Sequence, residues 1–262
     1  MKRLTRSFES HKRSCEGRAP STALRAVPLP RRAGADVFHH RANFVPRCAG
    51  ADVSARLYLV TPPLGEVAAF LRALDTVTNG NDIAALLLRL EDADERTLIN
   101  RAKEVAALVQ PRGIALLLDG RAELAARAGA DGAHLNGIAA LTAAIGALKP
   151  SRIAGAGGLK SRHDAMVAGE ANADYVMFGE PDRHGRTPPF AAVIERVSWW
   201  AEVFEVPCVG YAGTLDDVSA LAQAGSDFIA LGDWLWTNEQ TPAALIAAAS
   251  KYLGAIVASK AK

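Results

Sequence analysis

The chain has 262 residues, of which 50% are hydrophobic, 22% charged and 6% aromatic. This composition excludes collagen, coiled coils and wholly disordered chains, and it is typical of globular domains. The formal charge of +2 conceals an asymmetry, because residues 1–55 hold 11 Lys/Arg and 4 Asp/Glu, a balance of +7, whereas residues 56–262 hold 19 and 24, a balance of −5.

Residues 1–55 mix Arg, Ser, Pro and Gly without a sustained apolar period, so we expect a basic, disordered extension. The extension lacks the run of about 7–15 apolar residues of a secretory signal, and the chain lacks the roughly 20 of a membrane span. Its composition overlaps that of transit peptides and nucleic-acid-binding arms, but amphipathic spacing and a recognition motif are absent. Of the three cysteines, only Cys208 lies beyond the extension, so residues 56–262 cannot form an internal disulfide, which suits a reducing compartment. We therefore predict a cytoplasmic protein that binds neither nucleic acid nor membrane.

From residue 56 onward, short continuous apolar runs alternate with amphipathic stretches. Such runs indicate strands buried on both faces of a parallel sheet. The predicted strands are 57–61, 83–88, 114–118, 133–135, 153–157, 175–178, 208–211 and 228–231. The predicted helices are 67–74, 94–109, 123–128, 139–148, 163–168, 190–204, 215–222 and 243–256. Eight strand–helix units in about 205 residues predict a (β/α)8 TIM barrel, a single domain over residues 56–262.

Three similar strings stand where a predicted helix ends and the next strand begins, at 128–131 (AGAD), 171–174 (ANAD) and 224–227 (AGSD). Gly or Asn closes a helix in the left-handed conformation, and Asp hydrogen-bonds the turn. We interpret these strings as architecture at the end of the barrel opposite the active site.

The active site of such a barrel is built from the loops that follow the strands, and the loops after strands seven and eight commonly bind phosphate. Gly213 follows the seventh predicted strand and precedes Thr214, an expected helix N-cap, with Asp217 three residues on. Gly232 and Asp233 follow the eighth. The sequence therefore predicts a phosphate site at Gly213, Gly232 and Asp233.

A strand of leucine and alanine ends in a cation, Arg89. An unpaired buried cation is very costly, so we expect its guanidinium to point into the mouth, toward an anion or an acid such as Asp119. His134, at the fourth strand, is interpreted as a structural residue.

The four tryptophans form two tight pairs, Trp199-Trp200 in a predicted helix and Trp234/Trp236 after the last strand. Adjacent residues cannot share one helix face, so one of the first pair is expected to protrude, as in a homodimer interface. One of the second pair would cover the phosphate site. Core packing is the default interpretation of both pairs.

Five strings carry a family resemblance: RLYLVT (56–61), LLLRLED (86–92), LLLDGRAELAARAGADGAHLNG (116–137), ANADYVMFGE (171–180) and CVGYAGTLDDVSALAQAGSDFIALGDWLW (208–236). Their order and spacing resemble the thiamine-phosphate synthase and TenI (thiazole tautomerase) superfamily, whose corresponding strings include Q-L-R-x-K-D, L-I-N-D-R, G-A-D-G-V-H-L-G-Q and G-A-D-Y-I-G-F-G-P. The resemblance covers residues 56–262 and implies the same barrel.

Synthases of this family join a pyrimidine diphosphate to a thiazole phosphate and expel pyrophosphate, with magnesium bound by carboxylates. The resemblance implies that the small phosphorylated substrates bind at two sites. The pyrimidine diphosphate would lie among Arg89, Asp119, Asn136, Arg183 and Arg186, and Asp119 would hold Mg²⁺ largely through water. The thiazole phosphate would lie at Gly213, Gly232 and Asp233.

Several residues of the family motifs are replaced in this chain. The Asn-Asp pair becomes Asp119-Gly120, the segment of the second acid becomes 137–139 (GIA), and a family lysine falls on Glu91. The T-x-T-K loop becomes 183–187 (RHGRT), so Arg183 and Arg186 are expected to replace its lysine as phosphate clamps.

In the TenI branch a histidine is expected after the fifth strand, and that position aligns near Lys160 in this chain. Lys160 is therefore a candidate base, as is His163 one helical turn further on. Two alternatives to a synthase stay open. One is a degenerate member that binds a thiazole or other phosphate without turnover, and the other is a TenI-type tautomerase.

Overall fold

In the computed structural model the described part of the chain is residues 55–260, with side chains described for 55–256. Residues 1–54 and 261–262 lie outside it, so the disordered extension and its boundary remain predictions. Among the described residues, no helix is long and apolar enough to cross a membrane.

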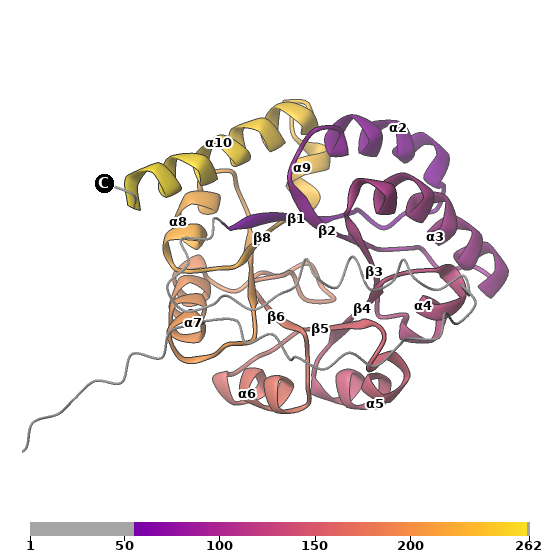
Figure 1. Ribbon diagram of the computed structural model, residues 1–262, viewed down its shortest axis with the longest axis horizontal. Helices are drawn as coiled ribbons and strands as arrows, with labels where there is room; N and C mark the ends of the chain where they lie inside the picture. Colours follow the sequence, from indigo (N-terminus) through magenta and orange to yellow (C-terminus); the bar gives the residue numbers. More distant parts are fainter. Residues whose placement is uncertain (1–54, 261–262) are drawn as a thin grey trace, which may run out of the picture. The chain divides into compact units, whose positions relative to one another are not determined.

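The described residues form a closed barrel of eight parallel strands in sequence order, which confirms the predicted fold (Figure 1). The strands are β1 (Arg56–Val60), β2 (Ile83–Leu88), β3 (Ala115–Asp119), β4 (Gly132–Asn136), β5 (Ile153–Gly157), β6 (Tyr175–Phe178), β7 (Cys208–Ala212) and β8 (Phe228–Leu231). β1 pairs with both β2 and β8, which closes the ring.

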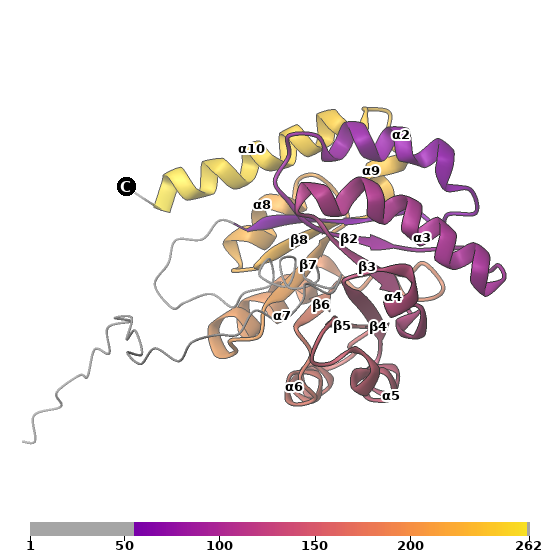
Figure 2. The ribbon, with the colours of Figure 1, turned by 45° about the vertical axis from the view of Figure 1, so that its right-hand side comes forward.

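Helices surround the barrel, and α10 lies beside α2 and α8 at the join between the first and last units (Figures 1 and 2). The helices are α2 (Val67–Thr78), α3 (Glu95–Val109), α4 (Ala122–Ala128), α5 (Ile138–Leu148), α6 (Arg162–Glu170), α7 (Phe190–Val203), α8 (Asp217–Gln223), α9 (Asp233–Thr237) and α10 (Pro242–Lys260). A 3₁₀ turn, η2 (Gln110–Arg112), precedes β3. Two of these short elements, α9 and η2, were not predicted from the sequence.

The strands are mostly apolar because both of their faces are buried, with polar residues mainly at their ends. One side of β1 and β2 contributes Tyr58, Val60 and Leu87 to the cluster inside the barrel. The alternate residues, such as Leu59 and Leu86, belong to the layer between the sheet and the helices. The period-2 alternation of a half-exposed strand is therefore absent from the sequence.

The three repeated strings have the architectural role predicted for them. Each contains a residue with positive φ, namely Gly129 (70°), Asn172 (65°) and Gly225 (97°). Each aspartate carboxylate accepts a backbone N–H of the preceding strand at 2.7 to 2.9 Å, and the pairs are Asp131 with Leu116, Asp174 with Ala154 and Asp227 with Cys208. Each aspartate thus links the loop before its own strand to the start of the preceding strand, at the end of the barrel opposite the mouth.

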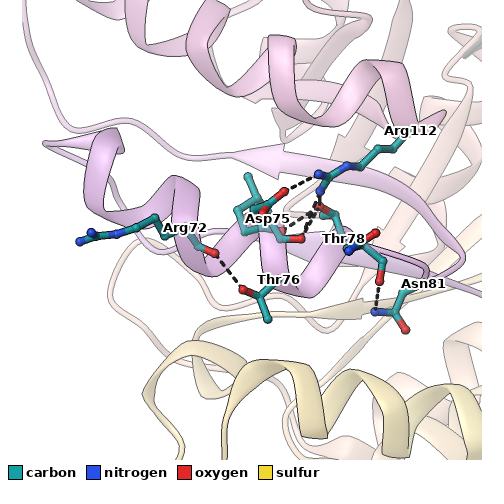
Figure 3. Close-up of polar contacts among 8 residues, drawn as sticks. Arg72, Asp75, Thr76, Thr78, Asn81 and Arg112 are labelled. Carbon is teal, nitrogen blue, oxygen red and sulfur yellow. Dashed lines mark hydrogen bonds and ion pairs between the residues drawn. The ribbon is translucent and has the colours of Figure 1, made fainter.

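Side chains satisfy the carbonyl groups at the C-terminal end of α2, where the last turn has no basic residue (Figure 3). Arg112 donates to the Asp75 carbonyl oxygen at 3.1 Å, and its guanidinium also binds the Asp75 carboxylate and the Thr78 hydroxyl. Asn81 donates to the Val77 carbonyl oxygen at 2.8 Å. A cation at this end also complements the helix dipole.

Arg112→Ala is expected to lower the free energy of unfolding by about 1–2 kcal/mol, because it removes charge-assisted hydrogen bonds from partly exposed groups. The matched control is Arg72→Ala, at an exposed residue of α2, with a change below about 0.5 kcal/mol. Urea unfolding monitored by tryptophan fluorescence measures both. Equal losses in the two variants would contradict the capping role of Arg112.

Candidate active site

Arg89 directly follows β2 and spans the mouth of the barrel from β2 to β8. Its backbone N–H donates to the Thr61 hydroxyl at 3.0 Å, and its Nε donates to the Thr61 carbonyl oxygen at 2.5 Å. Its Nη2 forms an ion pair with Asp233, the first residue of α9. The guanidinium thus lies in the mouth as expected, and its acidic partner is Asp233, whereas the sequence suggested Asp119.

Asp119 and Asn136 meet at the ends of β3 and β4. The Asn136 amide donates to Asp119 Oδ1 at 3.2 Å. Within residues 55–256, no three His, Cys, Asp or Glu side chains gather closely enough to bind a metal ion unaided. Asp119 and Asn136 therefore present one carboxylate and one amide side chain close together at the barrel mouth.

A chain of three hydrogen-bonded side chains lies inside the barrel. The hydroxyl groups of Tyr58 and Tyr175 are 2.8 Å apart, and His134 Nδ1 is 2.9 Å from the Tyr175 hydroxyl. Burial raises the pKa of both tyrosines far above the usual range, and it lowers the pKa of His134 despite the opposing charge of Asp119. All three side chains are therefore neutral at physiological pH. The buried position of His134 agrees with its interpretation as a structural residue.

Glu180 follows β6 and closes over the end of β5. Its Oε1 accepts the backbone N–H of Gly158. A Cβ on Gly157 would lie 2.3 Å from His134 Nε2 and 2.5 Å from Glu180 Oε1, so both side chains pack over this glycine. Burial, assisted by the charge of Asp119, raises the pKa of Glu180 to about 7.

Glu180 was not predicted as a site residue from the sequence. The available signal was its position directly after a strand, where the family string G-F-G-P has proline. Its environment depends on Gly157 and His134, which lie on other strands, so spacing alone could not reveal it.

The loop after β7 does not have the expected helix cap. Helix α8 begins at Asp217 with Asp216 as its N-cap, so the prediction of Thr214 as N-cap was wrong. Asp217 Oδ2 instead accepts the backbone N–H groups of Gly213 and Thr214, both at 2.9 Å. A carboxylate of the chain itself thus occupies the amides predicted to bind phosphate.

Gly232, at the end of β8, lies against a tyrosine. A Cβ there would lie 1.6 Å from the Tyr211 hydroxyl oxygen, so this position requires glycine. Next to it, Trp234 Nε1 donates to the Ala212 carbonyl oxygen and Trp236 Nε1 to that of Val60, both at 2.7 Å. These tryptophans fix α9 to the ends of β7 and β1.

The loop between β6 and α7 is closed by Asp182. The Asp182 carboxylate accepts from the Arg186 guanidinium at 2.8 and 3.0 Å, and from the backbone N–H groups of His184 and Arg186. The Arg186 hydrogen bonds lower the pKa of Asp182 strongly. Arg183 is exposed and donates from Nε to His184 Nε2 at 3.1 Å. Arg186 is therefore already paired with an acid. Among the described residues, no hydrogen bond or ion pair links Arg183 to Arg89.

Lys160 lies in the loop between β5 and α6, and its side chain is exposed. Its backbone N–H donates to Asp164 Oδ2 at 2.9 Å, and its carbonyl oxygen accepts from Arg196 at 3.0 Å. Asp164 also forms a capping box with Ser161 at the start of α6. The backbone of Lys160 is thus held in place by α6 and α7.

Residues 57–234 match a family model described as thiamine monophosphate synthase. A thiamine-phosphate synthase of Rhodospirillum centenum is 39% identical over 200 residues, which cover 73% of this chain and 94% of that protein. A thiamine-phosphate synthase of Hyphomonas neptunium is 38% identical, over 74% of this chain and 91% of that protein.

Solved structures agree on the fold. The thiamine phosphate pyrophosphorylase of Pyrococcus furiosus superposes with a TM-score of 0.64 at 20% identity, covering 77% of this chain and 96% of that one. A 3-hexulose-6-phosphate synthase gives 0.59 at 16% identity, over 75% and 99% of the two chains. With the family model matching most of the barrel and two relatives above 30% identity along nearly their whole length, this chain belongs to the thiamine monophosphate synthase family.

Proposed function

We propose that this protein condenses hydroxymethylpyrimidine diphosphate with a thiazole phosphate, forming thiamine phosphate and releasing pyrophosphate. Membership of the synthase family supports the reaction. The observation that carries it is the placement of Arg89, whose guanidinium is held in the barrel mouth by the Thr61 carbonyl oxygen and pairs with the half-exposed carboxylate of Asp233.

The reaction breaks the bond between the pyrimidine methylene carbon and the diphosphate oxygen, which keeps the electron pair. The thiazole nitrogen supplies its lone pair to the new C–N bond. Catalysis therefore depends on stabilising the charge that develops on the diphosphate. Arginine suits this role, since its planar guanidinium binds oxyanions through two parallel hydrogen bonds. The diphosphate would take the place of Asp233 at Arg89.

Further cations belong to the same proposal. Arg183 and Arg186 would bind phosphate oxygens from the loop after β6, with Arg186 exchanging Asp182 for substrate. Lys160 would add a positive charge from the neighbouring loop. Because these side chains are exposed, each is expected to contribute less than Arg89.

The thiazole phosphate is assigned to Gly213, Gly232 and Asp233. Backbone amides at a loop of this kind bind phosphate well. Here the phosphate would have to displace the Asp217 carboxylate from the amides of Gly213 and Thr214.

Magnesium would be held by Asp119, with the Asn136 side chain beside it, and would neutralise charge on the diphosphate. These residues fit the ion, because Mg²⁺ usually binds one or two carboxylates, several waters and substrate phosphates. Asp119→Asn is expected to raise the Mg²⁺ concentration for half-maximal activity at least tenfold. The matched control, Asp82→Asn, removes an exposed partner of Arg56 and should leave it unchanged. A Mg²⁺ titration of pyrophosphate release that is the same in both variants would contradict the assignment.

The test of the proposed function is pyrophosphate release by the full chain. Release should require both substrates and stop when EDTA removes Mg²⁺. Saturable binding of thiazole phosphate without any pyrophosphate release would instead support a degenerate binding protein.

A further inference from the structure

Glu180 is a carboxyl group in the barrel mouth with a fixed position. Its Oε1 is bound by the backbone N–H of Gly158, whose φ of 63° belongs to the left-handed region. Below it, Gly157 has no room for a Cβ between Glu180 and His134. With Oε1 anchored in this way, a ligand can bind Oε2 together with the second lone pair of Oε1.

The surroundings of Glu180 favour its neutral form on balance. Burial raises its pKa and outweighs the backbone N–H groups of Gly158 and of Glu180 itself, which lower it. The negative charge of Asp119, on β3, adds to burial, so that the pKa is raised to about 7. His134, on β4, is itself kept neutral by burial. The guanidinium of Arg196, on α7, acts in the opposite direction, but it is bound to the carbonyl oxygens of Leu159 and Lys160 at 3.2 and 3.0 Å. Tyr58 on β1, Tyr175 on β6 and Tyr211 on β7 also face Glu180, and burial raises the pKa of each of these tyrosines, so they are neutral.

The proposed reaction gives Glu180 no proton to remove. A C–O bond breaks and a C–N bond forms, and the nucleophile is a ring nitrogen without a proton. Recognition of the substrate therefore accounts for a protonated carboxyl better than general base catalysis does.

The pyrimidine of the substrate has an amino group beside a ring nitrogen, so one edge presents an N–H donor next to an acceptor. A neutral carboxyl presents the complementary pair, an O–H donor and a C=O acceptor, whereas a carboxylate only accepts. A site that hydrogen-bonds a substrate group rejects analogues that lack it.

We propose that Glu180 is a specificity-determining residue that recognises the aminopyrimidine, donating a hydrogen bond to a ring nitrogen and accepting one from the amino group. This inference rests on the proposed function, since it names how the same site selects its pyrimidine substrate.

The test measures binding to the full-length protein by calorimetry, with two probes. One is 4-amino-5-hydroxymethyl-2-methylpyrimidine, and the other has hydrogen in place of the amino group. The wild-type protein should prefer the amino compound at least tenfold at about pH 7, since each tenfold preference corresponds to about 1.4 kcal/mol. Its affinity should fall at least tenfold by about pH 9, as Glu180 loses its proton and with it the donor.

Two variants separate recognition from a structural role. Glu180→Gln keeps one donor and one acceptor without ionising, so it should keep the preference and lose the pH dependence. Glu180→Leu should lose the preference. Glu195→Gln, in an exposed ion pair on α7, is the matched control and should behave as wild type. A preference that survives in Glu180→Leu, or an unchanged pH dependence in Glu180→Gln, would overturn the inference, as would a wild-type protein that does not prefer the amino compound.

The two proposals fail separately. If the wild-type protein shows the preference but releases no pyrophosphate, the proposed function is wrong and the role of Glu180 stands. If pyrophosphate is released and Glu180→Leu still discriminates between the two probes, the synthase activity stands and the role of Glu180 does not.

Discussion

Arg89→Met is expected to lower kcat/KM for pyrophosphate release at least 100-fold, which corresponds to about 2.7 kcal/mol of lost transition-state stabilisation. Two effects combine. The variant loses the guanidinium that binds the leaving diphosphate, and it leaves the Asp233 carboxylate in the mouth without its partner, where it repels the substrate. Methionine preserves much of the side-chain volume, so the hydrogen bond between the residue 89 N–H and the Thr61 hydroxyl should remain.

Arg127→Met is the matched control for Arg89→Met. Arg127 forms an exposed ion pair with Glu95 between α4 and α3, and its loss should leave kcat/KM unchanged. Combining Arg89→Met with Asp233→Asn should recover part of the loss, because the added repulsion is removed. A decrease of less than threefold in Arg89→Met would contradict the role of this residue.

Trp200→Ala is expected to lower the free energy of unfolding by about 3–5 kcal/mol, the usual cost of removing a large buried aromatic side chain. Trp200 is fully buried on α7 and stacks on Phe204 with ring centroids 4.1 Å apart. Its Nε1 also donates to the Val206 carbonyl oxygen at 2.6 Å. The variant therefore loses packing and leaves a partly buried acceptor unsatisfied. Urea unfolding followed by far-UV circular dichroism measures the change.

Trp199→Ala provides the comparison within the same helix. Trp199 is half-buried, and its ring lies 4.8 Å from the Arg162 guanidinium, a contact worth about 1 kcal/mol. A loss in Trp199→Ala as large as in Trp200→Ala would show that burial does not separate the two positions. The partial exposure of Trp199 agrees with the expectation that one of the pair protrudes. A homodimer interface at this surface stays a prediction.

Most of the barrel could be predicted because its local signals agree with the final fold. The buried strands are apolar on both faces, and Gly129, Asn172 and Gly225 mark where helices end. The short helix α9 could not be predicted in this way. Its position depends on Trp234 and Trp236 binding the carbonyl oxygens of β7 and β1, and those strands become its neighbours only when the barrel closes.

The site was predictable in its location but less so in its pairings. The structure places Arg89 and Asp119 at the strand ends, where the sequence located them, and their role in binding substrate stays a prediction. The acid that pairs with Arg89 is 144 residues away in the chain, at Asp233, and closure of the barrel decides this contact. The phosphate site was likewise predicted at Gly213, but the sequence did not reveal that the Asp217 carboxylate accepts the Gly213 backbone N–H. Acids of the chain thus occupy positions where the sequence suggested substrate anions.

The most direct test of the account is identification by mass spectrometry of what the full-length protein makes from hydroxymethylpyrimidine diphosphate, thiazole phosphate and Mg²⁺. Thiamine phosphate and pyrophosphate are expected in equal amounts, with Arg89→Met forming at most about a hundredth as much product in the same time. Recovery of both substrates intact, from a folded protein that binds the thiazole phosphate, would contradict it.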